Sequence, residues 1–186
     1  MSTQDNNAGD GRVSRLPPLP RPLPPEVEEL FQDRLKRMGR ILNIHHVFGH
    51  APKLSRASAQ MAYSLRNETS VARLYIEIAI VRAAQHAKGV YEVQQHAPML
   101  LAEGFSREKL DALENWRTSG LFDEKERALL AYTDETCNCG DVSDATFAAM
   151  EQVFTPQQIM ELTFAIGSYY GTALVMNALR IKLEGS

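Results

Sequence analysis

The sequence predicts an all-α protein, and three observations support this. The 186 residues are 44% hydrophobic, which suits a compact domain with a core of its own. From about residue 26 onward, apolar residues recur at helical spacing between capping residues. The one run rich in β-branched residues, RLYIEIAIV at residues 73–81, continues into the alanine-rich RAAQHA, and this length favours a helix over a strand.

Residues 1–25 differ in composition from the rest of the chain. A polar lead rich in Gly and Asn precedes the proline-dense LPPLPRPLPP at residues 16–25. Proline removes amide donors and favours extended polyproline structure. We therefore expect a flexible lead that continues as a strap on the domain or on a neighbouring subunit, followed by a single domain over residues 26–186. A ligand for proline-recognising domains is the alternative for the strap.

Three helices are expected in the first half of the chain. The segment 25–40 begins with proline and acids and ends with bases, which suits the helix dipole. The segments 51–67 and 70–89 follow it. The last of these ends in a lysine followed by Gly89, which predicts a glycine stop.

Capping residues mark the helices of the second half. Ser106 is placed to cap its helix, and Asp123 with Glu126 has the spacing of a capping box. Thr155 and Gln158 have the same spacing before a long apolar helix. The helices expected here are 91–104, 106–116, 123–137, 143–154 and 157–183.

Two carboxylates and one imidazole are the candidate catalytic groups. Glu77 lies in an apolar helix, where a buried carboxylate needs a partner; an exposed Glu77 paired with Arg73 is the alternative. Glu92 and His96 are one helical turn apart and share a face. The alternative for them is a solvent-side pair, which contributes about 0.3–0.5 kcal/mol.

The stretch from Arg73 to Leu113, RLYIEIAIVRAAQHAKGVYEVQQHAPMLLAEGFSREKLDAL, resembles the central motif of the carboxymuconolactone decarboxylase family. That family also contains the alkyl-hydroperoxidase D-like proteins. The shared pattern is a Glu within an apolar helix, a break, a short motif ending in His96, and Gly104 before an acidic helix. The resemblance implies an alkyl-hydroperoxidase D-like helical bundle in which Glu77 reaches the face of His96 in a proton relay.

The thiols of the family's peroxidase branch are absent at the matching positions. That branch carries a Cys-x-x-Cys pair just before the His, and these positions are Gly89 and Glu92 here. Peroxide reduction by that mechanism needs a thiolate and a resolving thiol, so we do not expect it of this chain. Cys137 and Cys139 lie elsewhere, too close in sequence for an ordinary disulfide, and are expected to be reduced thiols near a helix end. A redox role for them is the alternative.

The resemblance implies a lyase: a cofactor-independent decarboxylase or related proton-transfer enzyme of aromatic-compound catabolism. Its substrate would be a small carboxylated lactone or unsaturated acid. The conjugated carbonyl of such a substrate takes up the electrons that carbon dioxide leaves behind, so no metal or organic cofactor is required. His96 would be the acid/base, Glu77 would set its tautomer and charge, and Glu92 would be a second proton shuttle. Three further residues are candidates for substrate binding: Arg82, Tyr91 and His50.

Several alternatives stay open. His45, His46 and His50 form a cluster whose spacing can bind zinc, but Gly49 and Pro52 favour a loop or helix end there, and structural or pocket-lining histidines are preferred. A non-catalytic oligomeric binding or scaffold protein is a second alternative. An alkylhydroperoxidase-like antioxidant protein is a third, disfavoured because the motif cysteines are absent. For Arg82 the alternative is a surface position.

Composition and charge bear on partners and location. The net charge is −3 without any basic run, which disfavours nucleic acid. No stretch approaches the roughly 20 apolar residues of a membrane helix, and the N-terminus lacks the apolar core of a secretion signal. The use of cysteine favours the cytoplasm. We expect a small-molecule substrate, no nucleic acid and no membrane.

Self-association is expected from the last long apolar segment. Its residues 164–176, FAIGSYYGTALVM, have more apolar faces than one neighbouring helix can cover. This favours a homo-oligomer, and the resemblance suggests a trimer or a hexamer. Tyr169 and Tyr170 within the segment are expected to make core or subunit contacts.

Overall fold

The computed structural model describes residues 13–185, apart from the side chain of Cys139. Over this range it contains nine α-helices, one 3-10 helix and no strand, which confirms the all-α prediction. The β-branched run at residues 73–81 lies in helix α4 (Arg73–His86). Residues 1–12 of the predicted flexible lead lie outside the described residues.

The chain forms two compact units. The first runs to Ala57 and takes up the chain again from Leu179, and the second is Ser58–Ala178. The boundary between them falls within helix α3 (Pro52–Asn67). The single domain over residues 26–186 stays a prediction, because two compact units can belong to one domain.

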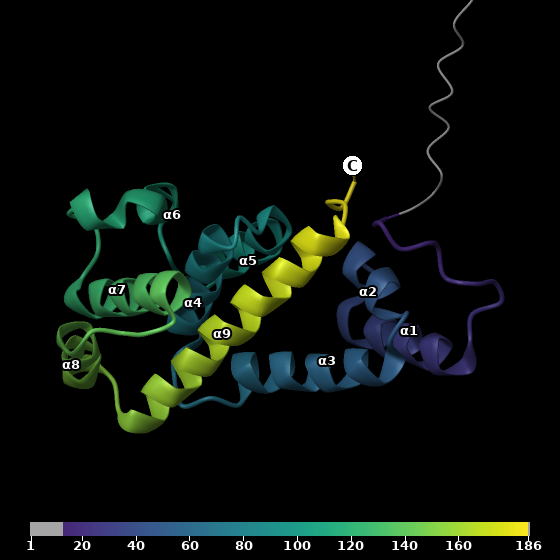
Figure 1. The fold of residues 1–186 in the computed structure, drawn as a ribbon, viewed down its shortest axis with the longest axis horizontal. Helices are drawn as coiled ribbons and strands as arrows, with labels where there is room; N and C mark the ends of the chain where they lie inside the picture. The colour runs from purple at the N-terminus through teal and green to yellow at the C-terminus, as the bar shows by residue number, and fades with distance from the viewer. Residues whose placement is uncertain (1–12, 186) are drawn as a thin grey trace, which may run out of the picture. The chain divides into compact units, whose positions relative to one another are not determined.

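The second unit holds the large hydrophobic core. Helix α4 packs against both α5 (Val90–Ala102) and α7 (Glu124–Cys139), as can be followed in Figure 1. Because α4 lies between these two helices, every residue from Ile76 to Ala84 is buried. The other elements of this part of the chain are α6 (Arg107–Ala112), η1 (Leu113–Thr118), α8 (Asp144–Val153) and α9 (Pro156–Leu179).

The predicted caps are present in this unit. The Ser106 hydroxyl accepts a hydrogen bond from the backbone N–H three residues on. Asp123 and Glu126 form a reciprocal capping box at the start of α7. Thr155 and Gln158 do the same before α9, since the backbone N–H of each donates to the side chain of the other. These bonds satisfy amides that have no partner within the helix.

The stop between α4 and α5 works differently from the prediction. Lys88, and not Gly89, adopts the left-handed conformation, with φ of 53°. A Cβ added at Gly89 would lie 2.8 Å from the Cβ of Ala173 in α9. Glycine is therefore needed here for the close approach of the α4–α5 connection to α9, and not for its left-handed freedom.

Helix α9 corrects one expectation from composition. Its 24 residues include a window of 18 with a mean hydropathy of 1.2, which is long and apolar enough to cross a membrane. The expectation that no stretch approaches a membrane helix was therefore wrong. A single such helix is weak evidence for a membrane, because the core helix of a protein without a membrane can have the same length and composition. Ile159, Leu162 and Ile166 of α9 are indeed buried in the core.

The first unit has a small core of its own, made by helix α1 (Pro25–Met38). Partly buried Leu19 and Leu23 of the proline-rich strap pack against this core. Just before the strap, the chain is tied to the C-terminal segment, because the amide of Lys182 donates to the carbonyl of Val13 at 2.9 Å. This part of the predicted strap therefore lies on its own unit.

A short helix, α2 (Asn43–Phe48), completes the first unit. It ends just before Gly49, which agrees with the helix end that was one of the two expectations for this segment. Its start is capped by an imidazole, since the Leu42 amide donates to Nδ1 of His45 at 3.0 Å. Histidine is an uncommon cap, which explains why the residue pattern does not indicate the start of this helix.

Candidate active site

Glu77, Glu92 and His96 come together in the second unit. Glu77 of α4 is fully buried, with 0% of its surface exposed, and Glu92 and His96 of α5 are each 4% exposed. Nδ1 of His96 lies 2.7 Å from Oε2 of Glu77, and Nε2 lies 3.4 Å from Oε2 of Glu92. The three side chains thus form one buried string, which excludes the solvent-side alternatives.

The fold explains this placement. Residues one turn apart share a face, so Glu92 and His96 both lie on the side of α5 that meets α4. The short connection through Lys88 and Gly89 turns the chain back, which brings α5 alongside α4. The carboxylate of Glu77 then faces a residue that is 19 positions away in the sequence.

Arg73 completes the surroundings of Glu77. Its Nε and one terminal nitrogen both lie 2.7 Å from Oε1 of Glu77. The pairing with Arg73 expected in the alternative is therefore present, although Glu77 is buried and not exposed. Burial acts to raise the pKa of Glu77, but the hydrogen bonds and charges of His96 and Arg73 outweigh it and lower the pKa. Glu77 is therefore ionised, and it holds a proton on Nδ1 of His96.

Glu92 is shifted in the opposite direction. Burial raises its pKa, and the nearby Glu77 charge adds to this, while His96 and Arg66 act against it. One imidazole thus lies between a carboxylate that is easily ionised and one that holds its proton more tightly. A pair of titrating groups pushed apart in this way is typical of acid/base sites.

Tyr169 of α9 borders the imidazole. Its ring stands edge-on to that of His96, with ring centroids 5.0 Å apart and an angle of 80°. Its hydroxyl accepts a hydrogen bond of 3.2 Å from Arg66 of α3. Burial raises the pKa of Tyr169 to about 12. The sequence predicted a core or subunit contact for Tyr169. It gave no sign that Tyr169 meets Arg66 beside His96.

Arg82 belongs to a different cluster. It is buried, so the surface alternative was wrong, and its Nε lies 2.6 Å from Oδ1 of Asp134. Asp134 also accepts hydrogen bonds from three other side chains: His86, Trp116 and Arg117. These bonds hold the pKa of Asp134 well below its usual range despite its burial. The guanidinium of Arg82 is therefore held by the protein itself, and its role in substrate binding stays a prediction.

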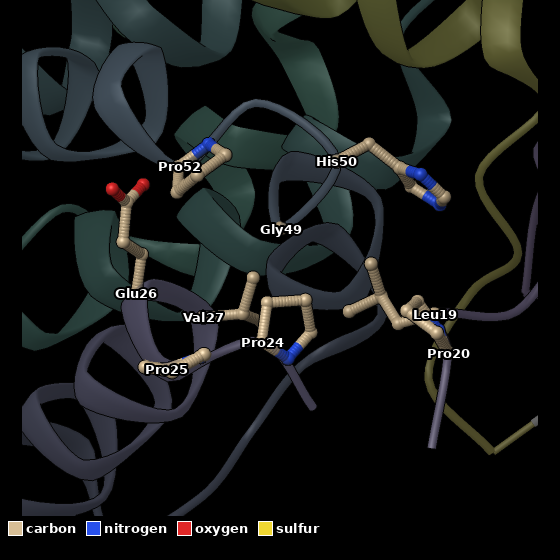
Figure 2. Close-up of a pocket in the computed structure, with 9 residues that line it drawn as sticks. All are labelled: Leu19, Pro20, Pro24, Pro25, Glu26, Val27, Gly49, His50 and Pro52. Carbon is tan, nitrogen blue, oxygen red and sulfur yellow. The ribbon is translucent and has the colours of Figure 1, made fainter. Parts of the chain in front are cut away.

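The other two candidate binding residues lie in different surroundings. Tyr91 is buried in the first turn of α5, next to Glu92 in the sequence. His50 belongs to the first unit, where its Nε2 lies 3.0 Å from the carbonyl oxygen of Pro17. It lines a cavity of about 580 Å³, and Figure 2 shows Glu26 and His50 on opposite sides of this cavity. Four prolines also line it: Pro20, Pro24, Pro25 and Pro52.

The histidines of the first unit make separate contacts. His45 caps α2, and burial, with Arg34 and His46 nearby, lowers the pKa of His45 to about 4. His46 stands edge-on to Phe31, with ring centroids 5.1 Å apart. Within residues 13–185 no group of three or more His, Cys, Asp or Glu side chains is arranged to hold a metal ion.

Cys137 lies in the last turn of α7, near a helix end as expected. It is a free thiol of intermediate burial. Burial and the charge of Asp134 raise its pKa to about 11. A thiol with so high a pKa is a poor nucleophile at neutral pH, which weakens the redox alternative.

Comparison with known proteins identifies the family. Residues 52–135, which contain Glu77, Glu92 and His96, match the model of the carboxymuconolactone decarboxylase family. This match places residues 52–135 in the family. No curated protein matches the chain.

Solved structures share the fold of this chain. An uncharacterized peroxidase-related protein from Silicibacter sp. TM1040 is 17% identical, with 96% of each chain covered and a TM-score of 0.83. The alkylhydroperoxidase AhpD core, an uncharacterized peroxidase-related protein from Ralstonia eutropha JMP134, is 18% identical, with 93% of each chain covered and a TM-score of 0.79. The debrominase Bmp8 is 18% identical, with 93% of this chain and 92% of its own covered and a TM-score of 0.75. At these identities the likeness shows the fold alone, and it confirms the predicted alkyl-hydroperoxidase D-like bundle.

Proposed function

We propose that this protein is a cofactor-independent proton-transfer enzyme. The reaction is the decarboxylation of a small carboxylated lactone or unsaturated acid, a cytoplasmic step in the catabolism of aromatic compounds. One observation carries the proposal: the imidazole of His96 is buried between Glu77 and Glu92, at 2.7 and 3.4 Å from their carboxylate oxygens.

The substrate itself accepts the electrons of the broken bond. When the bond to the carboxylate carbon breaks, carbon dioxide leaves, and the electron pair passes into the conjugated carbonyl as an enolate. The enzyme must then deliver one proton to the carbon and stabilise the developing negative charge. Burial makes nearby charges more effective than they are in water.

His96 is the proton donor in this mechanism. Because Nδ1 donates to the ionised Glu77, Nε2 is the nitrogen that carries the transferred proton in this mechanism. Transfer of this proton to the carbon leaves a neutral imidazole. Glu92, whose pKa is raised mainly by burial, then returns a proton to Nε2 and is itself reprotonated from solvent.

A panel of carboxylated lactones and β-keto acids tests the proposal through release of carbon dioxide. Wild type and Cys137→Ser should turn over at least one member equally, because the thiol takes no part. His96→Gln should lower kcat about 100-fold or more, the range typical of a lost acid/base group. Equal turnover by wild type and His96→Gln would favour the scaffold alternative. Hydroperoxide consumption that disappears in Cys137→Ser would favour the antioxidant alternative instead.

We also propose that the active form is a homo-oligomer, with a trimer or a hexamer favoured. Helix α9 carries exposed large apolar side chains: Met160, Phe164, Leu174 and Val175. A Cβ added at Gly167 or Gly171 would meet no atom within 4 Å, which leaves room for a second backbone to approach. Light scattering should give a multiple of the monomer mass for wild type and a smaller mass for Phe164→Glu. A monomeric wild type would contradict the proposal.

A further inference from the structure

We propose that Arg66 and Tyr169 form an anion-binding subsite beside His96, which holds a carboxylate that the substrate retains through the reaction. The identity of the ligand rests on the proposed function, whereas the subsite itself rests on the contacts of these two side chains.

The two residues meet at the edge of the buried string. The terminal nitrogen of Arg66 donates to the Tyr169 hydroxyl at 3.2 Å. The ring of Tyr169 in turn contacts the ring of His96, with centroids 5.0 Å apart. The Tyr169 side chain thus contacts both the guanidinium and the imidazole.

Arg66 differs from Arg73 and Arg82 because it makes no ion pair with a carboxylate of the described residues. Arg73 pairs with Glu77, and Arg82 pairs with Asp134. Among the described residues, no carboxylate lies within 4.0 Å of the Arg66 guanidinium, and its hydrogen bond goes to the neutral hydroxyl of Tyr169. Its remaining N–H groups are therefore available to a planar anion, for which a guanidinium is well shaped.

Tyr169 supplies a second donor. Its hydroxyl oxygen accepts from Arg66, so its own hydrogen is free to point elsewhere. Burial raises the pKa of Tyr169 to about 12, so the hydroxyl stays protonated at neutral pH. The charge of Arg66 also acts on the pKa of Glu92, which places the guanidinium in the same electrostatic environment as the catalytic string.

The chemistry of decarboxylation decides which acid group lies here. A carboxylate that is paired with Arg66 is stabilised in the ground state, and this pairing would raise the barrier to its loss. The subsite therefore suits a second acid group, which remains on the product. Neutral amides and esters would be rejected because they leave Arg66 without a counter-charge.

Isothermal titration with crotonate tests the subsite, because this small unsaturated acid has one carboxylate and undergoes no decarboxylation at neutral pH. Wild type should bind crotonate saturably and should not bind crotonamide. Arg66→Gln should weaken crotonate binding about tenfold or more, since a charge-assisted pair is lost. Tyr169→Phe should weaken it less, about threefold, since a neutral donor is lost. The control Arg107→Gln alters an exposed arginine paired with Asp111, and it should leave the Kd unchanged.

The outcomes separate this inference from the proposed function. If Arg66→Gln loses crotonate while no lactone is turned over by wild type, the subsite stands and the proposed function fails. Equal crotonate binding by wild type and Arg66→Gln overturns the subsite, whatever the turnover, and so does absence of saturable binding by wild type. Arg66→Lys keeps the charge and serves if the Gln variant does not fold. Its affinity should lie below that of wild type, because an ammonium lacks the planar fork, and undiminished affinity would contradict the subsite.

Discussion

Nδ1 of His96 lies 2.7 Å from the carboxylate of Glu77, although the two residues belong to different helices. This bond fixes the tautomer of the imidazole and leaves Nε2 toward Glu92. The same carboxylate also neutralises Arg73. Glu77 therefore links the stability of the α4–α5 pair to the chemistry of the site.

Replacing Glu77 by Gln should destabilise the fold strongly. The amide leaves two partners, Arg73 and His96, without a counter-charge in buried or partly buried positions. Loss of one member of such a buried pair lowers the free energy of unfolding by about 3–5 kcal/mol. Urea denaturation at pH 7 measures this. Asp111→Asn, which removes an exposed pair, is the control, and it should cost less than about 1 kcal/mol.

The cost of Glu77→Gln should shrink on acidification. The pKa of Glu77 is lowered in the folded state from its ordinary value of 4.5, so its stabilising contribution is complete above that pH. It is lost as pH falls through the lower folded pKa, because both states then bind the proton. A difference between variant and wild type that grows as the pH falls would contradict the assignment of an ionised Glu77.

Replacing Glu92 by Gln should have the opposite pH dependence. Its folded pKa is raised, so its contribution to stability is present below the ordinary value of 4.5 and is lost as pH rises through the folded pKa. Unfolding curves should therefore show little difference between Glu92→Gln and wild type at pH 4. At pH 8 the variant should be the more stable of the two. If Glu92→Gln instead becomes less stable than wild type as pH rises, the fold favours the charged form of Glu92.

Asp134 should matter for stability and not for the chemistry. It is buried and accepts from four side chains, including Arg82. Asp134→Asn should lower the free energy of unfolding by about 3–5 kcal/mol, because the cations lose their counter-charge. At a temperature where the variant remains folded, crotonate affinity should be unchanged. A fold-preserving variant with weakened crotonate binding would assign this cluster to the site.

Two glycines should respond oppositely to alanine. Gly89→Ala places a Cβ 2.8 Å from that of Ala173, and this overpacking should cost about 1–3 kcal/mol. Gly167 lies within α9, and a Cβ there would meet nothing within 4 Å. In the Phe164→Glu background, which is expected to dissociate, Gly167→Ala should therefore stabilise by about 0.5–1 kcal/mol through the higher helix propensity of alanine. Thermal unfolding measures both variants, and equal changes in their melting temperatures would contradict the close approach at Gly89.

The helices were predictable because their signals are local. The caps at Ser106 and Asp123 depend on residues a few positions apart, and the structure has them as expected. The start of helix α2 was not indicated because its cap is the imidazole of His45, which no common capping pattern contains. The role of Gly89 was also misjudged, because contact with Ala173 depends on a helix that is distant in the sequence.

The site was predictable only where a motif carried it. Glu77, Glu92 and His96 fall within the stretch that resembles the family, and the structure brings them together. Arg66 and Tyr169 are 103 positions apart, and periodicity gives the face of a helix but not its partner. The burial of Asp134 was equally hidden, since its donors come from α4 and η1 while it lies on α7.

Deuterium content of the product tests proton transfer by His96 most directly. In D₂O, a γ-carboxylated unsaturated lactone that loses carbon dioxide should yield a product with one carbon-bound deuteron, as mass spectrometry would show. Wild type should form this product, and His96→Gln should form it about 100-fold more slowly or worse, since the donor is absent. Formation of the singly deuterated product at the same rate by both proteins would contradict the account.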